Sequence, residues 1–416
     1  MSWINFISNK KNVFASQSFS AVISKVAAIA IAISVTVMLL SMSVLKGYKG
    51  LIKDKMAGFS GHIQILSSKT AKNYEYEPFL ISKKEIDDIA SNNQVKSVYP
   101  VAQKVGIAKT KTDLEGIIIK GLFPKNDSVF YSKALKSGRL PIIGENGRSN
   151  EIVISSTIAK RLKCEIGDVL KIYFFKENKT RGFAPKIVGI YSTGVEEYDK
   201  LFALCSYRDL ASHVIPAELF KSARDKNSLA ITQLEVKVKD FNRLEETNAQ
   251  LNDGLSYELR SESIRELQSQ VFDWLGYLDK NIQIILLLMG IVAAINMITS
   301  ILILIVDNTN LIGLLKSSGA ENFEVRRLFL KLALNVVFVG LIIGNVLAAA
   351  FIFLQKTTHI FKLNEANYYT DYVPVSFSIW DFIWINGLTI LICLLAMLIP
   401  SRYIAKISPV KALTFK

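Results

Sequence analysis

The stretch Ile282–Val306, IQIILLLMGIVAAINMITSILILIV, contains no charged side chain. At 1.5 Å per residue, a helix of this length reaches about 37 Å, which exceeds the roughly 30 Å hydrocarbon core of a bilayer. Val26–Val44, Leu332–Leu354 and Phe382–Pro400 are also apolar and uncharged. One charge at the membrane centre costs about 3 kcal/mol, so four uncharged segments predict four transmembrane helices.

The rest of the composition indicates a mixed membrane and soluble protein. Half of the 416 residues are hydrophobic, and the net charge is +14, yet the basic residues form no long run. This pattern argues against a nucleic-acid-binding tail. A cleaved signal peptide is the alternative for the first apolar segment, but that segment exceeds the usual core of about 7–15 residues.

Basic residues are unevenly distributed among the short connections, which predicts the orientation. Loop 307–331 and tail 401–416 each carry four Lys or Arg residues, whereas loop 355–381 carries two. The positive-inside rule therefore places both termini and loop 307–331 in the cytoplasm, with 45–281 outside. In segment 1–25, the apolar side chains near Lys10 would form an interfacial helix or belong to a disordered tail. These apolar side chains are Trp3, Phe6 and Ile7.

The segment between the first two predicted spans is expected to fold as an extracytoplasmic α+β domain. Short β-rich runs such as Gly116–Lys120 and Glu151–Ile154 alternate with helical runs such as Ser156–Leu162. Composition shifts near 125 and 228, which predicts a subdomain 125–227 inserted into a part made of 45–124 and 228–281. The predicted divisions are 1–25, 26–44, 45–281, 282–306, 307–331, 332–354, 355–381, 382–400 and 401–416.

Long helices are predicted on both flanks of this domain. Ser263 and Glu266 fit a capping box, in which each side chain binds a free amide at a helix start. A helix starting at Ile264 could run to Val306. The first span could likewise extend to Met56 before a glycine ends it. Such helices could transmit force or hold the domain off the lipid.

Loop 307–331 contains a short predicted helix. Asn308 or Thr309 can cap it, and Gly319 is placed to end it. The apolar run Leu311–Leu315 suits either the groove of a partner protein or the lipid interface. Within the spans, Asn296 should face another helix, and Gly340 with Gly344 forms a small-residue packing motif.

Motifs for catalysis or metal binding are missing from the sequence. It has no G-x-x-x-x-G-K-[ST], H-E-x-x-H, G-x-S-x-G or G-x-G-x-x-G, and its three histidines lie far apart. The three cysteines form no C-x-x-C, and the sequence does not decide whether Cys164 and Cys205 form a disulfide. We therefore expect a chain that is not an enzyme and binds no cofactor or metal.

Four stretches give the chain a family resemblance. They are SMSVLKGYKGLIKDKMAGFSGHIQIL (41–66), GIYSTGVEEYDKLFAL (189–204), VAAINMITSILILIVDNTNLIGLLKSSGAENFEVRRLFL (292–330) and PSRYIAKISPVKAL (400–413). They resemble the MacB/FtsX-like ABC permease superfamily, and within it the lipoprotein-releasing LolC/LolE branch. The resemblance implies a type VII ABC permease architecture in the bacterial inner membrane, with a periplasmic domain between helices 1 and 2.

The resemblance also implies partners and site residues. A separate ATPase subunit would bind ATP and Mg²⁺ and dock on a coupling helix within 310–320. Further partners would be a second permease copy or a paralogue, a lipoprotein cargo and a periplasmic lipoprotein chaperone. The coupling residues would be Asn310, Ile312, Leu314, Leu315, Lys316, Gly319 and Ala320. The cargo acyl chains would contact Val37, Met38, Ser41 and Asn296.

The family resemblance is compatible with more than one function. The chaperone-recruiting hook would map to Lys176–Pro185, where the loop is short. A LolC-like, LolE-like or combined subunit fits equally well. A MacB-like exporter of drugs or peptides and an FtsX-like regulator of a cell-wall hydrolase are the other candidates, although FtsX-like outer domains are usually much smaller.

Overall fold

The computed structural model describes residues 19–401 except 71–75, 125–127, 144–147, 177–178, 226 and 365–367. Residues 1–18 of the predicted interfacial segment 1–25 and residues 402–416 of the predicted tail 401–416 therefore lie outside the described residues. The chain divides into two compact units. The first unit contains the described residues up to Gly50, Trp274–Leu363 and those from Tyr372 onward, and the second contains Leu51–Asp273 and Asn364–Asp371.

Among the described residues, four helices are long and apolar enough to cross a membrane. They are α2 (Phe19–Ser60), α11 (Ser269–Asp307), α13 (Asn322–Thr358) and α15 (Ile379–Ser401). Each contains one of the predicted apolar segments, and an α+β domain lies in the chain between α2 and α11. The predicted fold class is therefore confirmed.

The ends of the long helices follow local backbone chemistry. Gly61, at φ +75°, ends α2, because a residue without a Cβ adopts this left-handed conformation most easily. The predicted capping box of Ser263 and Glu266 is confirmed. The predicted continuous helix from Ile264 is wrong, because α10 (Ile264–Leu267) stops at Gln268, where φ is −121° and ψ is 40°.

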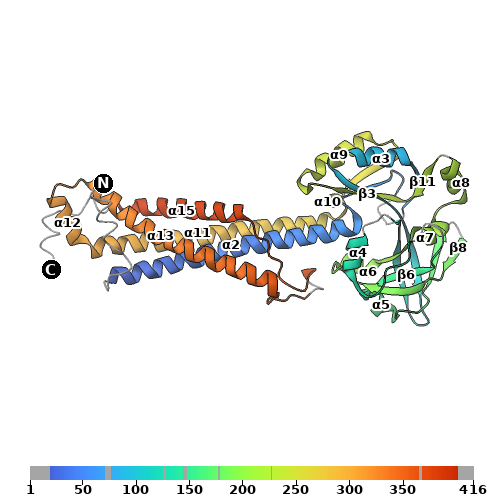
Figure 1. Ribbon diagram of the computed structural model, residues 1–416, viewed down its shortest axis with the longest axis horizontal. Coiled ribbons are helices and arrows are strands. Elements are labelled where there is room, and N and C mark those ends of the chain that lie inside the picture. Colours follow the sequence, from blue (N-terminus) through green and yellow to red (C-terminus); the bar gives the residue numbers. More distant parts are fainter. Residues whose placement is uncertain are drawn as a thin grey trace. The chain divides into compact units, whose positions relative to one another are not determined.

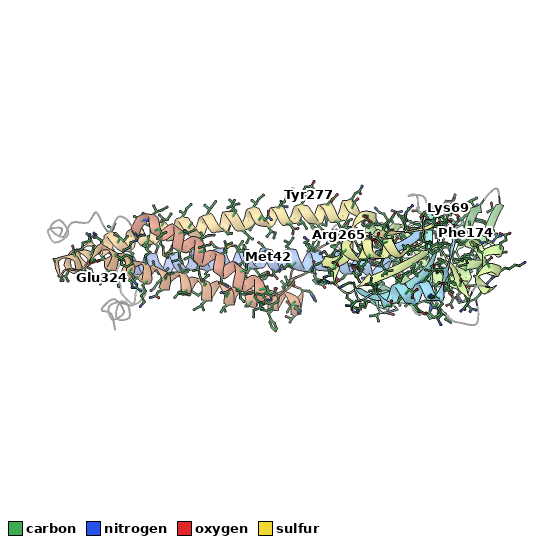
Figure 2. All side chains as sticks on the ribbon, turned by 90° about the horizontal axis from the view of Figure 1, so that it is seen from above. Met42, Lys69, Phe174, Arg265, Tyr277 and Glu324 are labelled. Atoms are coloured by element: carbon green, nitrogen blue, oxygen red, sulfur yellow. The ribbon has the colours of Figure 1, made fainter. Side chains whose placement is uncertain are left out.

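The first unit is a helix bundle with a large apolar core. Side chains from α2, α11, α13 and α15 meet there, among them Ile31, Met297, Phe329 and Cys393. Figure 1 shows the short helix α12 (Thr309–Ser317) at one end of the bundle, between α11 and α13. Outward-facing side chains such as Tyr277, which is 63% exposed, point away from the helices (Figure 2). Within the apolar spans, Leu287, Val346 and Leu395 are exposed as well, and such side chains suit contact with lipid.

The second unit is built on a mixed sheet with the order β13-β1-β12-β3-β4-β10-β6-β9-β5, and β7 joins β8 to β3. The pairs β10–β4 and β6–β9 are parallel, and the other pairs are antiparallel. The strands are β1 (Ile63–Ser67), β3 (Val95–Lys109), β4 (Leu114–Leu122), β5 (Leu135–Gly138), β6 (Glu151–Ser155), β7 (Lys171–Lys176), β8 (Lys179–Phe183), β9 (Lys186–Tyr191), β10 (Phe202–Ser206), β12 (Gln233–Val238) and β13 (Leu259–Ser263). A separate pair joins β2 (Phe79–Ser82) to β11 (Ser228–Ile231).

Helices cover this sheet and close its core. The apolar side chains of the central strands, such as Ile119, Ile154 and Cys205, are fully buried beneath helices that include α5 and α7. The helices are α3 (Lys83–Ser91), α4 (Ser128–Ala134), α5 (Ser156–Leu162), α6 (Glu196–Leu201), α7 (Tyr207–Val214), α8 (Ala217–Asp225), η1 (Phe241–Arg243) and α9 (Leu244–Gly254). Cys164, Cys205 and Cys393 are free thiols.

Candidate functional site

The predicted coupling segment folds as a helix with defined ends. Asn308 precedes the first turn of α12, and its side-chain amide donates to the carbonyl oxygen of Leu304 at 2.8 Å. Gly319, at φ +89°, terminates the turn that follows. Glu321 and Glu324 then form a capping box at the start of α13. The predicted short helix of loop 307–331 is therefore present, and a turn at Ser318–Glu321 separates it from α13.

The side chains of this helix divide between the bundle and its surroundings. Ile312 is fully buried in the bundle core, and Leu315 and Ala320 pack against that core from partly buried positions. Leu314 is 55% exposed, and Asn310 and Gly319 are exposed as well. Lys316 is half-buried. The outward face of α12 therefore presents Leu314 as its large apolar side chain.

Helices α2 and α13 approach each other closely at two glycines. A Cβ added to Gly340 would lie 2.8 Å from the carbonyl oxygen of Ala28, and one added to Gly344 would lie 2.8 Å from that of Ala32. The Thr36 hydroxyl donates to the Gly344 carbonyl oxygen at 3.1 Å. Small residues permit such backbone approach, and the resulting close packing contributes to helix association in lipid.

The four predicted cargo-contacting residues do not share one environment. Met38 is buried in the bundle core, so its side chain fills the interior. Val37 and Ser41 are half-buried on α2, and Asn296 is half-buried on α11. Val37, Ser41 and Asn296 are therefore the members of this set that retain accessible surface.

Polar contacts in the bundle were not visible in the sequence. Asn345 on α13 and Asn386 on α15 exchange two amide hydrogen bonds of 2.9 and 3.0 Å. Lys49 on α2 lies 2.6 Å from Asp279 on α11, and Lys46 lies 2.5 Å from Asp381 on α15. Each pair joins residues from separate helices, and only the helix packing brings them together.

A buried ion pair lies in the α+β domain. Lys120 Nζ on β4 is 2.6 Å from Glu235 Oε1 on β12, and it also donates to the carbonyl oxygen of Phe59 at the end of α2. Burial lowers the pKa of Lys120 and raises the pKa of Glu235, and the opposite charge of each partner opposes these shifts. The pair therefore links the last turn of α2 to the central sheet.

The motif 189–204 is organised by one carboxylate. Asp199 accepts hydrogen bonds from the backbone amides of Thr193 and Gly194 and from the hydroxyls of Thr193 and Ser192. Asp199 is only 4% exposed, and Gly194 has φ +71°. A carboxylate that accepts several backbone N–H bonds fixes the turn around it. Asp199 therefore has a structural role in the motif.

The hairpin β7–β8 carries the region predicted as a hook. Its tip, residues 177–178, lies outside the described residues. Beside the tip, Phe175 is 56% exposed, and Arg181 donates to the carbonyl oxygen of Ser212 at 3.1 Å. Phe174, on the opposite face of the strand, is buried beside Phe183. The hairpin is thus anchored on one face and presents an aromatic side chain on the other.

Comparison with known proteins covers nearly the whole chain. Residues 24–253 match the MacB-like periplasmic core domain, and residues 283–409 match the FtsX-like permease C-terminal family. The chain belongs to the MacB/FtsX-like ABC permease superfamily. It is a multi-pass membrane protein with a periplasmic domain. The transmembrane subunits of this family are typically non-catalytic.

Relatives within the superfamily are distant but align over nearly their full length. The chain is 23% identical to the lipoprotein-releasing system transmembrane protein LolE of Haemophilus influenzae, covering 95% of this chain and 94% of the relative. It is 21% identical to LolC of the same system in Neisseria meningitidis serogroup B, covering 96% and 95%.

A solved structure also matches in part. The periplasmic region of MacB from Actinobacillus actinomycetemcomitans is 13% identical, with a TM-score of 0.33, covering 50% of this chain and 91% of that region. Within the described part of the chain, no three His, Cys, Asp or Glu residues are grouped so that they could hold a metal ion.

Proposed function

We propose that this chain is the permease subunit of an ATP-driven complex that releases lipoproteins from the outer leaflet of the bacterial inner membrane. The released lipoprotein would pass to a periplasmic chaperone for delivery to the outer membrane. The observation that carries the proposal is the similarity of 95% of the chain to a lipoprotein-releasing transmembrane protein. Because the sequence has no P-loop, ATP and Mg²⁺ would bind to a separate ATPase subunit.

The ATPase would dock on α12 from the cytoplasm. This orientation follows from the basic residues of loop 307–331 and tail 401–416, and it places both termini in the cytoplasm. The exposed side chain of Leu314 suits an apolar groove, while Ile312 and Leu315 hold the helix on the bundle. A push on α12 would then be transmitted to the core shared by α11 and α13.

Cargo and chaperone would bind on the outer side of the complex. The acyl chains would enter beside α2 and α11, where Val37, Ser41 and Asn296 are accessible. A second copy of the chain or a paralogue would complete the complex. The periplasmic domain would consist of a porter-like part (45–124 and 228–281) and an inserted subdomain (125–227), whose β7–β8 hairpin is the candidate chaperone contact.

Depletion of the protein, followed by fractionation of a radiolabelled outer-membrane lipoprotein, tests the proposed activity. We expect the mature lipoprotein to accumulate in the inner membrane, because its release requires the complex. Re-expression of the chain should restore delivery to the outer membrane. Normal sorting in depleted cells would contradict lipoprotein release and favour an exporter or a cell-wall regulator.

The coupling role of α12 is tested with Leu314→Asp. We expect the variant to insert into the membrane but to lose co-purification with the ATPase, because a carboxylate replaces the exposed apolar contact. Leu114→Asp is a matched control, since Leu114 is 65% exposed on β4 of the periplasmic domain. Retention of the ATPase by Leu314→Asp, or its loss in both variants, would contradict the assignment.

A further inference from the structure

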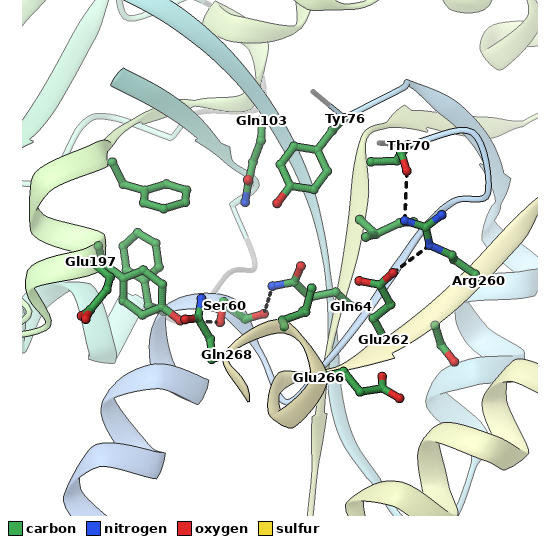
Figure 3. Close-up of a pocket in the computed structure, with 16 residues that line it drawn as sticks. Ser60, Gln64, Thr70, Tyr76, Gln103, Glu197, Arg260, Glu262, Glu266 and Gln268 are labelled. Carbon is green, nitrogen blue, oxygen red and sulfur yellow. Dashed lines mark hydrogen bonds and ion pairs between the residues drawn. The ribbon is translucent and has the colours of Figure 1, made fainter. Parts of the chain in front are cut away.

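Two cavities of the molecule differ in how their polar groups are engaged. In the polar cavity beside the end of α2, Arg260 donates to Glu262 at 2.9 Å, and Gln64 donates to the carbonyl oxygen of Ser60 at 3.2 Å (Figure 3). Contacts within the chain therefore hold these side chains. A second cavity lies in the bundle, and its polar groups are free to meet a ligand.

This second cavity is a groove of about 440 Å³ between α11 and α15, called the α11–α15 groove below. Apart from Gln283 on α11 and Trp384 on α15, its lining consists of aliphatic side chains and a glycine. A Cβ added to that glycine, Gly290, would lie 3.0 Å from Cδ1 of Ile392. The missing side chain therefore keeps the groove open at this level.

The α11–α15 groove extends over about one leaflet of the bilayer. At 1.5 Å per residue, its lining on α11 from Gln283 to Ala294 covers about 16 Å, close to half of the roughly 30 Å hydrocarbon core. The periplasmic domain precedes α11, and α13 returns the chain to the periplasmic side, so α11 and α15 both start there. Gly290 faces Ile392. Gln283 and Trp384 each precede this pair by about two turns, so both lie at the periplasmic end.

The width of the groove suits a hydrocarbon chain. A volume of about 440 Å³ over about 16 Å corresponds to a width of about 6 Å, whereas a helix with its side chains is about 10–12 Å across. A helix of a second copy is therefore too wide to enter the groove. The groove also opens onto the lipid-facing surface, because Leu287 is 64% exposed and Trp384 is 59% exposed. One acyl chain from the surrounding lipid fits these dimensions.

Two hydrogen-bond donors are available at the periplasmic end of the groove. Gln283 is exposed, and neither its amide nor the indole of Trp384 has a hydrogen-bond partner within the described residues. Both groups carry N–H donors, which the ester carbonyl oxygens of a lipid can accept. Trp380, one turn before Trp384, is 74% exposed, and tryptophans at span ends are typical of the membrane–water interface. The donors therefore lie at the level of lipid ester groups.

A cation lies just outside these donors. Lys280 is exposed on α11, about one turn before Gln283 and on the same face of the helix. Its ammonium group lies 5.6 Å from the ring centroid of Tyr277, and it forms no ion pair in the part of the chain that the structure describes. The neighbouring Asp279 is bound to Lys49 instead. Lys280 can therefore attract a phosphate group at the membrane surface.

We propose that the α11–α15 groove binds a glycerophospholipid of the periplasmic leaflet. One acyl chain occupies the groove, Gln283 and Trp384 donate to the ester carbonyl oxygens, and Lys280 binds the phosphate. The lipid anchor of a lipoprotein has acyl chains but no phosphate, so Lys280 favours a phospholipid over the proposed cargo. The bound chain fills the space between α11 and α15. This site is independent of the proposed lipoprotein release.

Tryptophan fluorescence of the full-length chain in detergent tests the proposal. One version keeps only Trp384, through Trp3→Phe, Trp274→Phe and Trp380→Phe, and a second version keeps only Trp380. The probe is phosphatidylglycerol with brominated acyl chains, because bromine quenches a nearby indole. We expect saturable quenching of Trp384, and weaker quenching without saturation of Trp380, which lies outside the groove.

Three variants of the version that keeps Trp384 locate the lipid. Gly290→Leu should raise the half-quenching lipid concentration about tenfold or more, because its side chain displaces methylene groups of the acyl chain. Gly387→Leu is the matched control, since Gly387 does not line the groove and a Cβ there meets nothing within 4 Å. Lys280→Gln should weaken binding of phosphatidylglycerol about fivefold but leave brominated diacylglycerol, which has no phosphate, unchanged. This exposed variant keeps the test decisive if Gly290→Leu fails to fold, as judged by its melting temperature.

The same titrations distinguish the other occupants. Quenching of Trp384 without saturation, or equal effects of Gly290→Leu and Gly387→Leu, would overturn binding in the groove. Equal affinity for phosphatidylglycerol and diacylglycerol would overturn the phospholipid and indicate the anchor of an acylated protein. Quenching that appears only when a dimer dissociates would overturn the proposal and assign the groove to a second copy. The titration contains no ATPase or lipoprotein, so a failure of lipoprotein release would leave its outcome unaffected.

Discussion

Two polar pairs, one buried in the domain and one half-buried in the bundle, show how differently the two compact units treat polar groups. In the periplasmic domain, Lys120 and Glu235 form an ion pair whose side chains are 0% and 5% exposed. In the bundle, Asn345 and Asn386 exchange two hydrogen bonds between neutral amides. Loss of one partner leaves an uncompensated charge in the first case but only an unpaired amide in the second. The same deletion should therefore cost far more in the domain than in the bundle.

Replacement of Lys120 with methionine should give the largest effect. We expect a loss of about 3–5 kcal/mol in the stability of the periplasmic domain, because Glu235 would stay buried without its partner. Hydrogen exchange in β4 and β12 of the full-length chain measures this loss. The double variant Lys120→Met/Glu235→Leu should recover most of it, and an equal loss in single and double variants would contradict the explanation.

The pH dependence of stability provides a second comparison between the periplasmic domain and the bundle. His62 Nδ1 accepts from the backbone amide of Val238 at 3.0 Å, and burial, reinforced by Lys237 and Lys96, lowers the pKa of His62 to about 4. The unfolded chain, with its ordinary pKa of 6.5, binds a proton that the folded domain excludes. Stability should therefore be full above pH 6.5 and fall by up to about 3 kcal/mol as the pH drops to about 4.

Hydrogen exchange in β1 and β12 at several pH values measures this dependence. His62→Asn keeps an acceptor near the amide of Val238 but does not titrate. In this variant, the protection of β1 and β12 amides against hydrogen exchange should therefore vary less below pH 6.5. The neutral amides Asn345 and Asn386 do not titrate, and protection of α13 and α15 is the internal reference. Equal pH dependence in wild type and His62→Asn would rule out His62 as its origin.

The packing of α13 on α2 sets a third test, in the bundle alone. Gly344→Ala should destabilise the bundle by about 1–3 kcal/mol, because its Cβ would press on the backbone of Ala32. Gly387→Ala is the matched control, since a Cβ there meets nothing within 4 Å. The melting temperatures in detergent should separate the two variants, and equal melting temperatures would show that the close approach can relax.

The helices of the bundle could be predicted because lipid imposes a simple pattern on the sequence. Four charge-free stretches indicated the spans, and Ser263 and Gly319 indicated helix ends. The break at Gln268 escaped prediction, since no glycine or proline is located there. The subdomain boundaries at 125 and 227 stay a prediction.

The direction in which each side chain points was harder to predict than the helices and strands themselves. Within the short helix α12, the sequence offered Ile312, Leu314 and Leu315 alike, but only the packing shows that Ile312 points into the core. The ion pair of Lys120 and Glu235 joins strands far apart in the chain, so no local pattern signals it. Orphan amides such as that of Gln103 likewise emerge only from the folded environment.

The smallest effect is expected for the amide pair of the bundle. Asn386→Leu should cost about 0.6 kcal/mol, and at most about 1.7 kcal/mol, because hydrogen bonds between membrane helices contribute little net stability. Melting temperatures of Asn386→Leu and of the double variant Asn345→Leu/Asn386→Leu measure it, and the double variant should recover stability by removing the unpaired amide. A loss as large as that of Lys120→Met would instead mean that a neutral pair in lipid is worth as much as a buried ion pair.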